Sequence, residues 1–137
     1  MHTGDPERFV RWLRRMVPSD GSAVVEPYRG RMSVTAAFSI TPLGGDAVGE
    51  DGSVGRVIAE VVRVVRDSGL PHETNAMFTN VEGSLEDVLA LIGRCVTQVM
   101  ARAPRASVVV KLDVRPGVAD ALHGKVASIE RQIQRGP

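Results

Sequence analysis

The sequence predicts an α+β fold, an α/β sandwich in which helices lie on one face of a four-stranded antiparallel sheet. Three observations predict it. Strand-like and helix-like segments follow one another in the order β-α-β-β-α-β, with one more helix at the C-terminal end. This order is typical of ferredoxin-like domains. The length of 137 residues, and a content of 43% apolar and 24% charged side chains, suit one globular domain of this size.

The first strand, residues 32–41, alternates between apolar and hydroxyl side chains. Its apolar positions are Val34, Ala36, Phe38 and Ile40, and its hydroxyl positions are Ser33, Thr35, Ser39 and Thr41. This period of two predicts a strand with one buried face. Pro42 and the glycines that follow are expected to end it. The hydroxyl face is the first candidate for function.

A helix is predicted next, because the apolar residues of 54–65 recur at helical spacing. Ser53 is the expected N-terminal cap, and Gly69 the expected stop after the last turn. Most of these apolar residues are valines, which are poor helix formers, so packing against a sheet must stabilise the helix.

Residues 72–83 form an extended run that fits either one long strand or two short strands around a turn near 75–78. Ser84 and Asp87 resemble a capping box for a second amphipathic helix, which Pro104 ends. Residues 107–114 predict the last strand, and apolar residues between 122 and 133 a third helix. We expect the helices to cover one face of the sheet. The other face is half apolar, which predicts that it packs on a second copy as a homo-oligomer, a dimer or tetramer.

Residues 1–31 differ from the predicted domain at 32–137. They carry a balance of +2 charges, and an amphipathic helix is predicted over 6–17. Three interpretations stay open: a helix for a membrane surface or a partner, a short appendage of the domain, or an extension upstream of a start at Met32.

Composition argues against several classes of function. Residues 32–137 carry a net charge of −1, without the basic excess expected of a nucleic-acid-binding domain. No apolar run approaches the ~20 residues of a membrane span. Cys95 is the single cysteine, and the three histidines show no ligand spacing, so neither a disulfide nor a metal site is expected. The expected compartment is the cytoplasm.

The candidates for catalysis are few. Cys95 has no sequence signal for activation, and no serine lies in a G-x-S-x-G elbow. Glu82 and Asp113 could converge as a pair of carboxylates, which leaves a small acid/base enzyme as a third hypothesis. The residues favour binding over turnover.

Four segments in this order resemble the small thiamine- and hydroxymethylpyrimidine-binding proteins with a ferredoxin-like fold. They are Phe-Ser-Ile-Thr-Pro-Leu-Gly at 38–44, Ser-Gly-Leu at 68–70, Met-Phe-Thr-Asn-Val-Glu-Gly at 77–83, and Lys-Leu-Asp-Val-Arg at 111–115 with Lys-Val-Ala-Ser-Ile at 125–129. The third matches that family's M-x-T-x-x-E-G pattern and the last its K-V-x-S-I/V. The similarity spans about 32 to 133.

The resemblance implies a non-enzymatic binder of thiamine or its pyrimidine precursor that needs no cofactor and assembles as dimers or tetramers. An aminopyrimidine needs fixed hydroxyl, amide or backbone partners in a mostly apolar slot. The candidate ligand-binding residues are Ser39, Thr41, Asn75, Met77, Thr79, Glu82 and Asp113. Met77 is expected to form a wall for the ring, and the carboxylates of Glu82 and Asp113 are expected to balance the thiazolium charge.

Lys111, Asp113 and Arg115 fit either an ion-pair network or a phosphate-bearing ligand. The rival interpretation is a structural or regulatory oligomerisation module without a small-molecule ligand.

Overall fold

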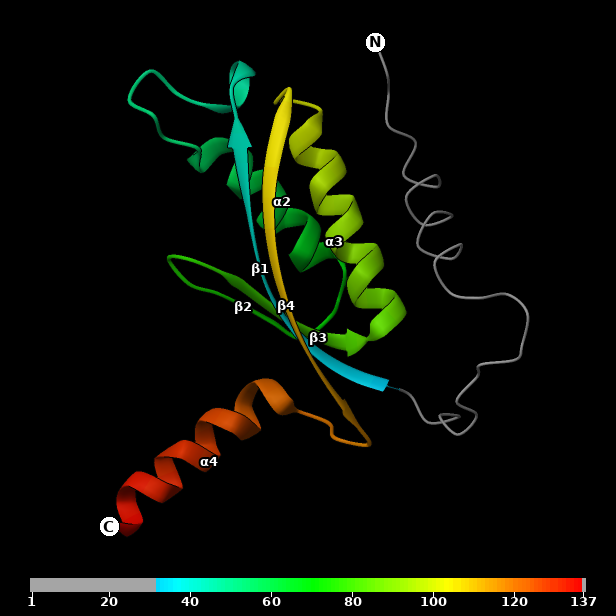
Figure 1. The fold of residues 1–137 in the computed structure, drawn as a ribbon, viewed down its shortest axis with the longest axis vertical. Coiled ribbons are helices and arrows are strands. Elements are labelled where there is room, and N and C mark those ends of the chain that lie inside the picture. Colours follow the sequence, from blue (N-terminus) through cyan, green and yellow to red (C-terminus); the bar gives the residue numbers. More distant parts are fainter. Residues whose placement is uncertain (1–31, 137) are drawn as a thin grey trace, which may run out of the picture.

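The computed structural model describes residues 32–136, and the predictions made for 1–31 lie outside this range. The described chain folds as the predicted ferredoxin-like α+β domain (Figure 1). Its sheet is antiparallel throughout, with strand order β2-β3-β1-β4. The elements are β1 (Met32–Leu43), the 3-10 turn η1 (Gly45–Ala47), α2 (Gly55–Asp67), β2 (His72–Thr74), β3 (Thr79–Ser84), α3 (Leu85–Met100), β4 (Arg105–Pro116) and α4 (Ala121–Arg135).

Strand β1 is the centre of the sheet, paired with β3 along one edge and with β4 along its whole length. Its burial alternates as predicted, and Phe38 on the apolar face is only 2% exposed. The strand runs to Leu43, so the predicted end at Pro42 was wrong. The pairing with β3 ends at Phe38, so at Pro42 β1 has a registered partner only in β4. A proline without an N–H group is tolerated at such a local edge.

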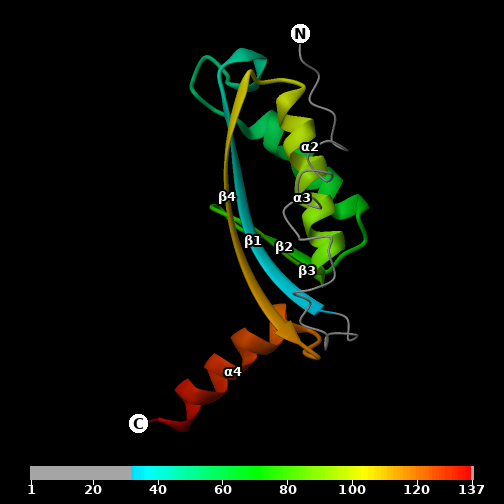
Figure 2. The same cartoon turned by 45° about the vertical axis from the view of Figure 1, so that its right-hand side comes forward.

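Helices α2 and α3 cover one face of the sheet, as Figures 1 and 2 show. Helix α2 buries Val57, Val61 and Val65, which repeat every four residues, so packing stabilises a helix made largely of valines. Gly69 follows the helix with φ 72° and makes the predicted stop. The predicted cap at Ser53 was wrong: Val54 is the N-cap residue and makes no side-chain cap bond, and the Ser53 N–H donates to Asp51 instead.

Helix α3 begins as predicted at the Ser84 cap, whose hydroxyl oxygen accepts a bond from the Asp87 N–H at 3.1 Å. The two helices are also joined on their outer surface. Glu60 of α2 accepts hydrogen bonds from Gln98 at 2.9 Å and from Arg102 at 3.0 Å. The bond from Gln98 is the main reason that the pKa of Glu60 lies below its usual value.

The run at 72–83 forms two short strands, which settles the alternative left open by the sequence. Asn75 makes the turn between them, since its Oδ1 accepts bonds from the N–H groups of Met77 and Phe78, each at 2.9 Å. This is an Asx-type turn, in which the side chain replaces a backbone acceptor.

Strand β4 is an edge strand, longer by two residues at each end than predicted. Its register with β1 places Val108, Val110, Leu112 and Val114 opposite Ile40, Phe38, Ala36 and Val34, on the face that α2 and α3 cover. These four residues of β4 nevertheless remain between 38% and 43% exposed. The apolar core is therefore closed over β1 and β3 but open at β4.

Helix α4 departs from the expectation that the helices share one face. Its N-terminal end lies against the face opposite α2 and α3, and the helix then runs away from the sheet (Figure 2). Ala121 and Leu122 are buried there, whereas Val126, Ile129 and Ile133 are exposed. Among residues 32–136, no helix is long and apolar enough to cross a lipid bilayer.

Candidate functional site

The face of the sheet opposite α2 and α3, here called the open face, carries most of the polar side chains of the strands. The strand register orders them in rows across β3, β1 and β4. One row is Glu82, Thr35 and Asp113, and the next is Asn80, Ala37 and Lys111. Farther along, β3 ends and β1 pairs with β4 alone. Small Ala37 at the centre of the second row, between longer neighbours, leaves room above the sheet.

The first turn of α4 is fixed on the open face by the two carboxylates of the Thr35 row. Glu82 is 6% exposed, and its Oε2 accepts a bond from the backbone N–H of Leu122 at 3.1 Å. The other oxygen of Glu82 accepts from the Ser33 hydroxyl at 3.4 Å. Asp113 forms an ion pair with Lys125. This hydrogen bond and charge from Lys125, together with the charges of Arg115 and Lys111, hold the pKa of Asp113 below its usual value.

His123 adds a third link between α4 and the sheet. Its Nδ1 lies 2.6 Å from Oδ1 of Asp120, and its Nε2 lies 3.5 Å from Oε1 of Glu73 in β2. The hydrogen bond to Asp120 is the main reason that the pKa of His123 is raised, and the negative charges of Asp120, Glu73 and Glu82 act in the same direction. The imidazolium form therefore strengthens the attachment of α4.

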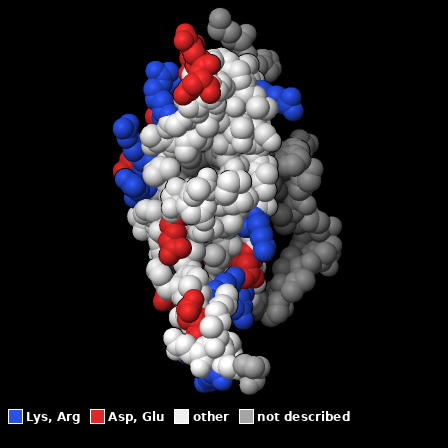
Figure 3. All heavy atoms as spheres, turned by 90° about the vertical axis from the view of Figure 1, so that its left-hand side faces the viewer, with Lys and Arg blue, Asp and Glu red and all other residues white. Residues whose placement is uncertain are grey.

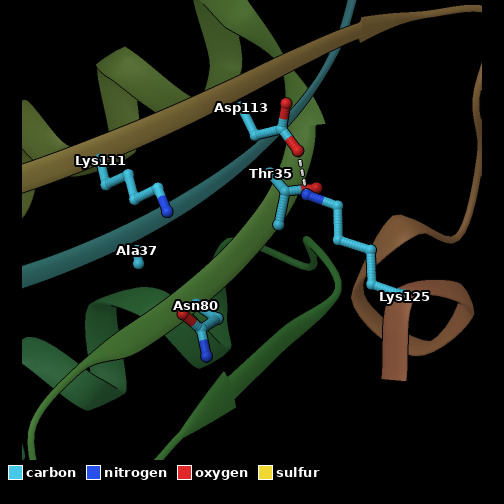
Figure 4. A pocket seen from close by; sticks show the side chains of 6 residues that line it. All are labelled: Thr35, Ala37, Asn80, Lys111, Asp113 and Lys125. Carbon is cyan, nitrogen blue, oxygen red and sulfur yellow. Dashed lines mark hydrogen bonds and ion pairs between the residues drawn. The ribbon is translucent and has the colours of Figure 1, made fainter. Parts of the chain in front are cut away.

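A hollow of about 140 Å³ lies beside this attachment (Figure 4). It is lined by Thr35, Ala37, Asn80, Lys111, Asp113 and Lys125. In Figure 4 the Lys125 chain comes from α4 to Asp113 and Thr35, while Lys111 extends from β4 toward Ala37. Hydroxyl, amide, carboxylate and ammonium groups thus converge over a small apolar floor, which is the composition of a site for a small polar ring.

The structure brings only part of the predicted ligand-binding set to this hollow. Asp113 lines it, and Glu82 lies in the adjoining row. Ser39 and Thr41 lie on the same face of β1, opposite Val109 and Ser107 of β4 and beyond the end of β3. They extend the polar surface away from the hollow.

The other three predicted residues lie elsewhere. Asn75 and Met77 belong to the turn between β2 and β3, where Met77 is 73% exposed. Thr79 is opposite Phe38 in the register, so it points to the helix side and is 8% exposed. Its hydroxyl lies 3.4 Å from that of Thr74. Their ligand-binding roles stay predictions.

Of the other five lining residues, the sequence named Lys111 as a possible contact of a phosphate-bearing ligand and missed Thr35, Ala37, Asn80 and Lys125. Strand parity alone identifies Thr35, because it shares the face of Ser39. Asn80 was obscured because its pairing depends on where the turn of the β2-β3 hairpin falls. Lys125 was obscured because α4 was expected on the other face.

The described residues offer little to metal or thiol chemistry. Across residues 32–136, no three His, Cys, Asp or Glu side chains come close enough together to hold a metal ion. Cys95 is buried in α3, and this burial raises the pKa of its thiol to about 11. A thiol with so high a pKa is a packing group at neutral pH.

The sequence profile of the family described as Thiamine-binding protein matches residues 36–130. The chain belongs to this family. The match confirms the resemblance inferred from the four segments, and it includes α2, both short strands, α3, β4 and the larger part of α4.

Individual relatives and solved structures are also similar to this chain. The UPF0045 protein Mb1933 of Mycobacterium bovis is 55% identical over 105 residues, which cover 76% of this chain and 98% of the relative. The crystal structure of protein MJ1052 from Methanocaldococcus jannaschii matches with a TM-score of 0.63 at 30% identity, covering 72% of this chain and 96% of that one. A Thermotoga maritima protein, provisionally described as a thiamine biosynthesis/salvage protein, matches with a TM-score of 0.60. At 22% identity over 71% of this chain and 98% of its own, that likeness shows the fold alone.

Proposed function

We propose that this protein binds thiamine or its hydroxymethylpyrimidine precursor without catalysis, as a homo-oligomer in the cytoplasm. The observation that carries the proposal is the hollow on the open face, in a member of the thiamine-binding protein family. The proposal places the pyrimidine ring over Ala37, between the amide of Asn80 and the hydroxyl of Thr35.

The size of the hollow supports a ring rather than a whole vitamin. Sites that enclose a drug-sized ligand measure about 300–1,000 Å³. A hollow of about 140 Å³ suits one six-membered ring, and any further part of the ligand must lie outside it. Ser39 and Thr41 are placed along β1 to contact such a part, which gives these two predicted residues a role consistent with their position.

The proposed absence of catalysis rests on how the two carboxylates are used. Glu82 and Asp113, the pair considered for acid/base chemistry, flank Thr35 in one row as expected. Both are engaged by α4, one through the Leu122 N–H and the other through Lys125. They therefore position a helix, and neither is available to move protons.

Isothermal titration of the full chain with thiamine and with hydroxymethylpyrimidine tests the proposal. Asn80→Ala is expected to weaken binding about 10-fold, since one hydrogen-bonding partner of the ring is lost. Asn75→Ala, with the same chemical change in the β2-β3 turn, is the comparison variant: a site in the hollow predicts normal binding, whereas the ligand-binding role predicted for Asn75 from the sequence predicts a loss. Absence of heat with both ligands at millimolar concentration contradicts the proposal. A loss confined to Asn75→Ala places the ligand at the turn instead.

Self-association is proposed on a different surface from the one expected from the sequence. The open face is largely polar, whereas Val108, Val110, Leu112 and Val114 of β4 are exposed on the helix side. An apolar edge strand of 12 residues also presents unpaired backbone groups. Antiparallel pairing of two such edges is self-complementary under a two-fold axis, so we propose a second copy as the occupant.

Sedimentation of two matched variants tests this assignment. Leu112→Asn, on the helix side of β4, is expected to shift the protein toward monomer. Val109→Asn, on the open face of the same strand, is expected to leave the assembly unchanged. A monomeric parent protein, or dissociation by Val109→Asn alone, contradicts the assignment.

The rival function is an oligomerisation module without a ligand. The charged side chains on the surface in Figure 3 mix both signs around its margins and leave a broad uncharged area between them. On the face that Figure 3 shows, the described residues form no continuous basic surface of the kind found at nucleic-acid sites, which supports a small molecule or a protein as partner. If the protein is instead an oligomerisation module, Asn80→Ala does not change the heat of the ligand titration, and only the β4 variants change the result, by altering the assembly seen in sedimentation.

A further inference from the structure

The charge of the hollow distinguishes among the ligands that the proposed function allows. Its lining includes two ammonium groups, Lys111 and Lys125, and one carboxylate, Asp113. Lys125 and Asp113 pair with each other. The remaining charge of the hollow is therefore positive, and it belongs to Lys111.

Lys111 has no ion-pair or hydrogen-bond partner within residues 32–136. In Figure 4 its side chain reaches toward the small residue Ala37, with no interaction drawn to its nitrogen. The long side chain of Lys111 thus places an unneutralised cation beside the space that the ring is proposed to occupy.

Both carboxylates near the hollow already have hydrogen-bonding or ionic partners. Both oxygens of Glu82 accept bonds, from Leu122 and from Ser33, and the residue is buried beneath the start of α4. Asp113 is neutralised by Lys125. A cationic ligand in the hollow meets the Lys111 ammonium, and Asp113, the carboxylate among the lining residues, is already paired with Lys125.

An anionic substituent on the ligand is instead attracted by the Lys111 ammonium. A phosphate monoester offers acceptor oxygens to which the Lys111 ammonium donates a charge-assisted bond, while the Thr35 hydroxyl and the Asn80 amide contact the ring. Lys111 comes from β4, whereas Thr35 and Asn80 come from β1 and β3, so the phosphate is expected on the β4 side of the hollow. Charge-assisted bonds to phosphate are about twice as strong as neutral ones.

We propose that the hollow takes the phosphate monoester of an aminopyrimidine alcohol in preference to the free alcohol or cationic thiamine, with Lys111 as the residue that selects the phosphate. This inference rests on the proposed function and names its ligand class.

Isothermal titration with four probes tests it: hydroxymethylpyrimidine, its phosphate ester, thiamine and inorganic phosphate. The ester is expected to bind about 10-fold more tightly than the alcohol, by one charge-assisted bond, and this advantage is expected to shrink as salt is raised. Lys111→Met is expected to abolish the advantage, so that the ester and the alcohol bind this variant with equal affinity. Lys111→Arg keeps the positive charge and is expected to retain most of the tighter binding of the ester.

Arg94→Met, which removes an exposed cation from α3, is the matched control and is expected to preserve the preference. Equal binding of ester and alcohol, tighter binding of thiamine than of the ester, or a preference that survives Lys111→Met overturns the inference and leaves the proposed function standing. Inorganic phosphate that binds as tightly as the ester also overturns it, because the ring then contributes nothing. If none of the three organic probes binds, both proposals fall.

Discussion

The two faces of the sheet are built by the same strands but are covered in different ways. On one face, α2 and α3 bury the apolar residues of β1 and β3, including Phe38 and Val81. On the other, within residues 32–136, the start of α4 is attached through polar bonds to Glu82, Asp113 and Glu73. Apolar burial is insensitive to pH, whereas ionic attachment is not. The comparison teaches that apolar packing holds the fold on one face, while the other face carries polar and ionic contacts that respond to pH.

The largest expected effect comes from opening the covered face. Phe38→Ala removes a ring that is 2% exposed at the centre of β1 and is expected to lower the free energy of unfolding by about 3–5 kcal/mol. Thr41→Ala, an exposed position of the same strand on the open face, is expected to change it by less than about 0.5 kcal/mol. Urea denaturation compares the two. Similar losses for both variants contradict the division between the faces.

The next effect concerns the attachment of α4. Glu82→Ala leaves the Leu122 N–H without its acceptor in a buried position, at an expected cost of about 1–3 kcal/mol. Because the bond fixes only the start of α4, faster amide hydrogen exchange is expected in the first turn of that helix. Glu130→Ala, exposed farther along α4, serves as the control. Unchanged exchange at Leu122 in the Glu82 variant contradicts this role.

A smaller effect is expected from pH, with opposite signs at two residues. The pKa of His123 is raised above its usual 6.5, so its contribution is complete below that value and is lost as pH rises through the raised pKa. The pKa of Asp113 is lowered from 3.8, so its contribution is present above 3.8 and is lost as pH falls through the lowered pKa. The attachment of α4 is therefore strongest between about pH 4 and 6.5.

Titration of His123 by NMR checks the upper limit of that range. Asp120→Asn is expected to return the pKa of His123 toward 6.5, because it removes both the charge and the strongest acceptor of the imidazolium. A pKa at or below 6.5 in the parent protein contradicts the proposed third link.

The smallest effect is expected at Cys95, which reports on the covered face without altering it. Its pKa of about 11 leaves almost no thiolate at pH 8, and the side chain is buried. A thiol reagent is therefore expected to label the folded protein very slowly and the urea-unfolded protein rapidly. Fast labelling of the folded protein would show that α3 opens more readily than its packing implies.

The sequence by itself determined the covered half of this protein. Alternation in β1, the repeat of valines in α2 and the Ser84 cap depend on residues close together in the chain, so their periods and signals can be read directly. They predicted the elements, the layered fold and the apolar side of β1 correctly. The family resemblance followed from short segments of the same kind.

Only the tertiary structure decided which polar residues meet. The hollow depends on register, which pairs Ala37 with both Asn80 and Lys111, and a shift of one residue in either strand turns these side chains to the other face. It also depends on the placement of α4, whose helical period is the same on either side of the sheet. Bonds from the buried carboxylate Glu82 and from Asp113 fix that placement, and they join residues 40 and 12 positions apart. No local pattern specifies such contacts, because they arise when the chain closes on itself.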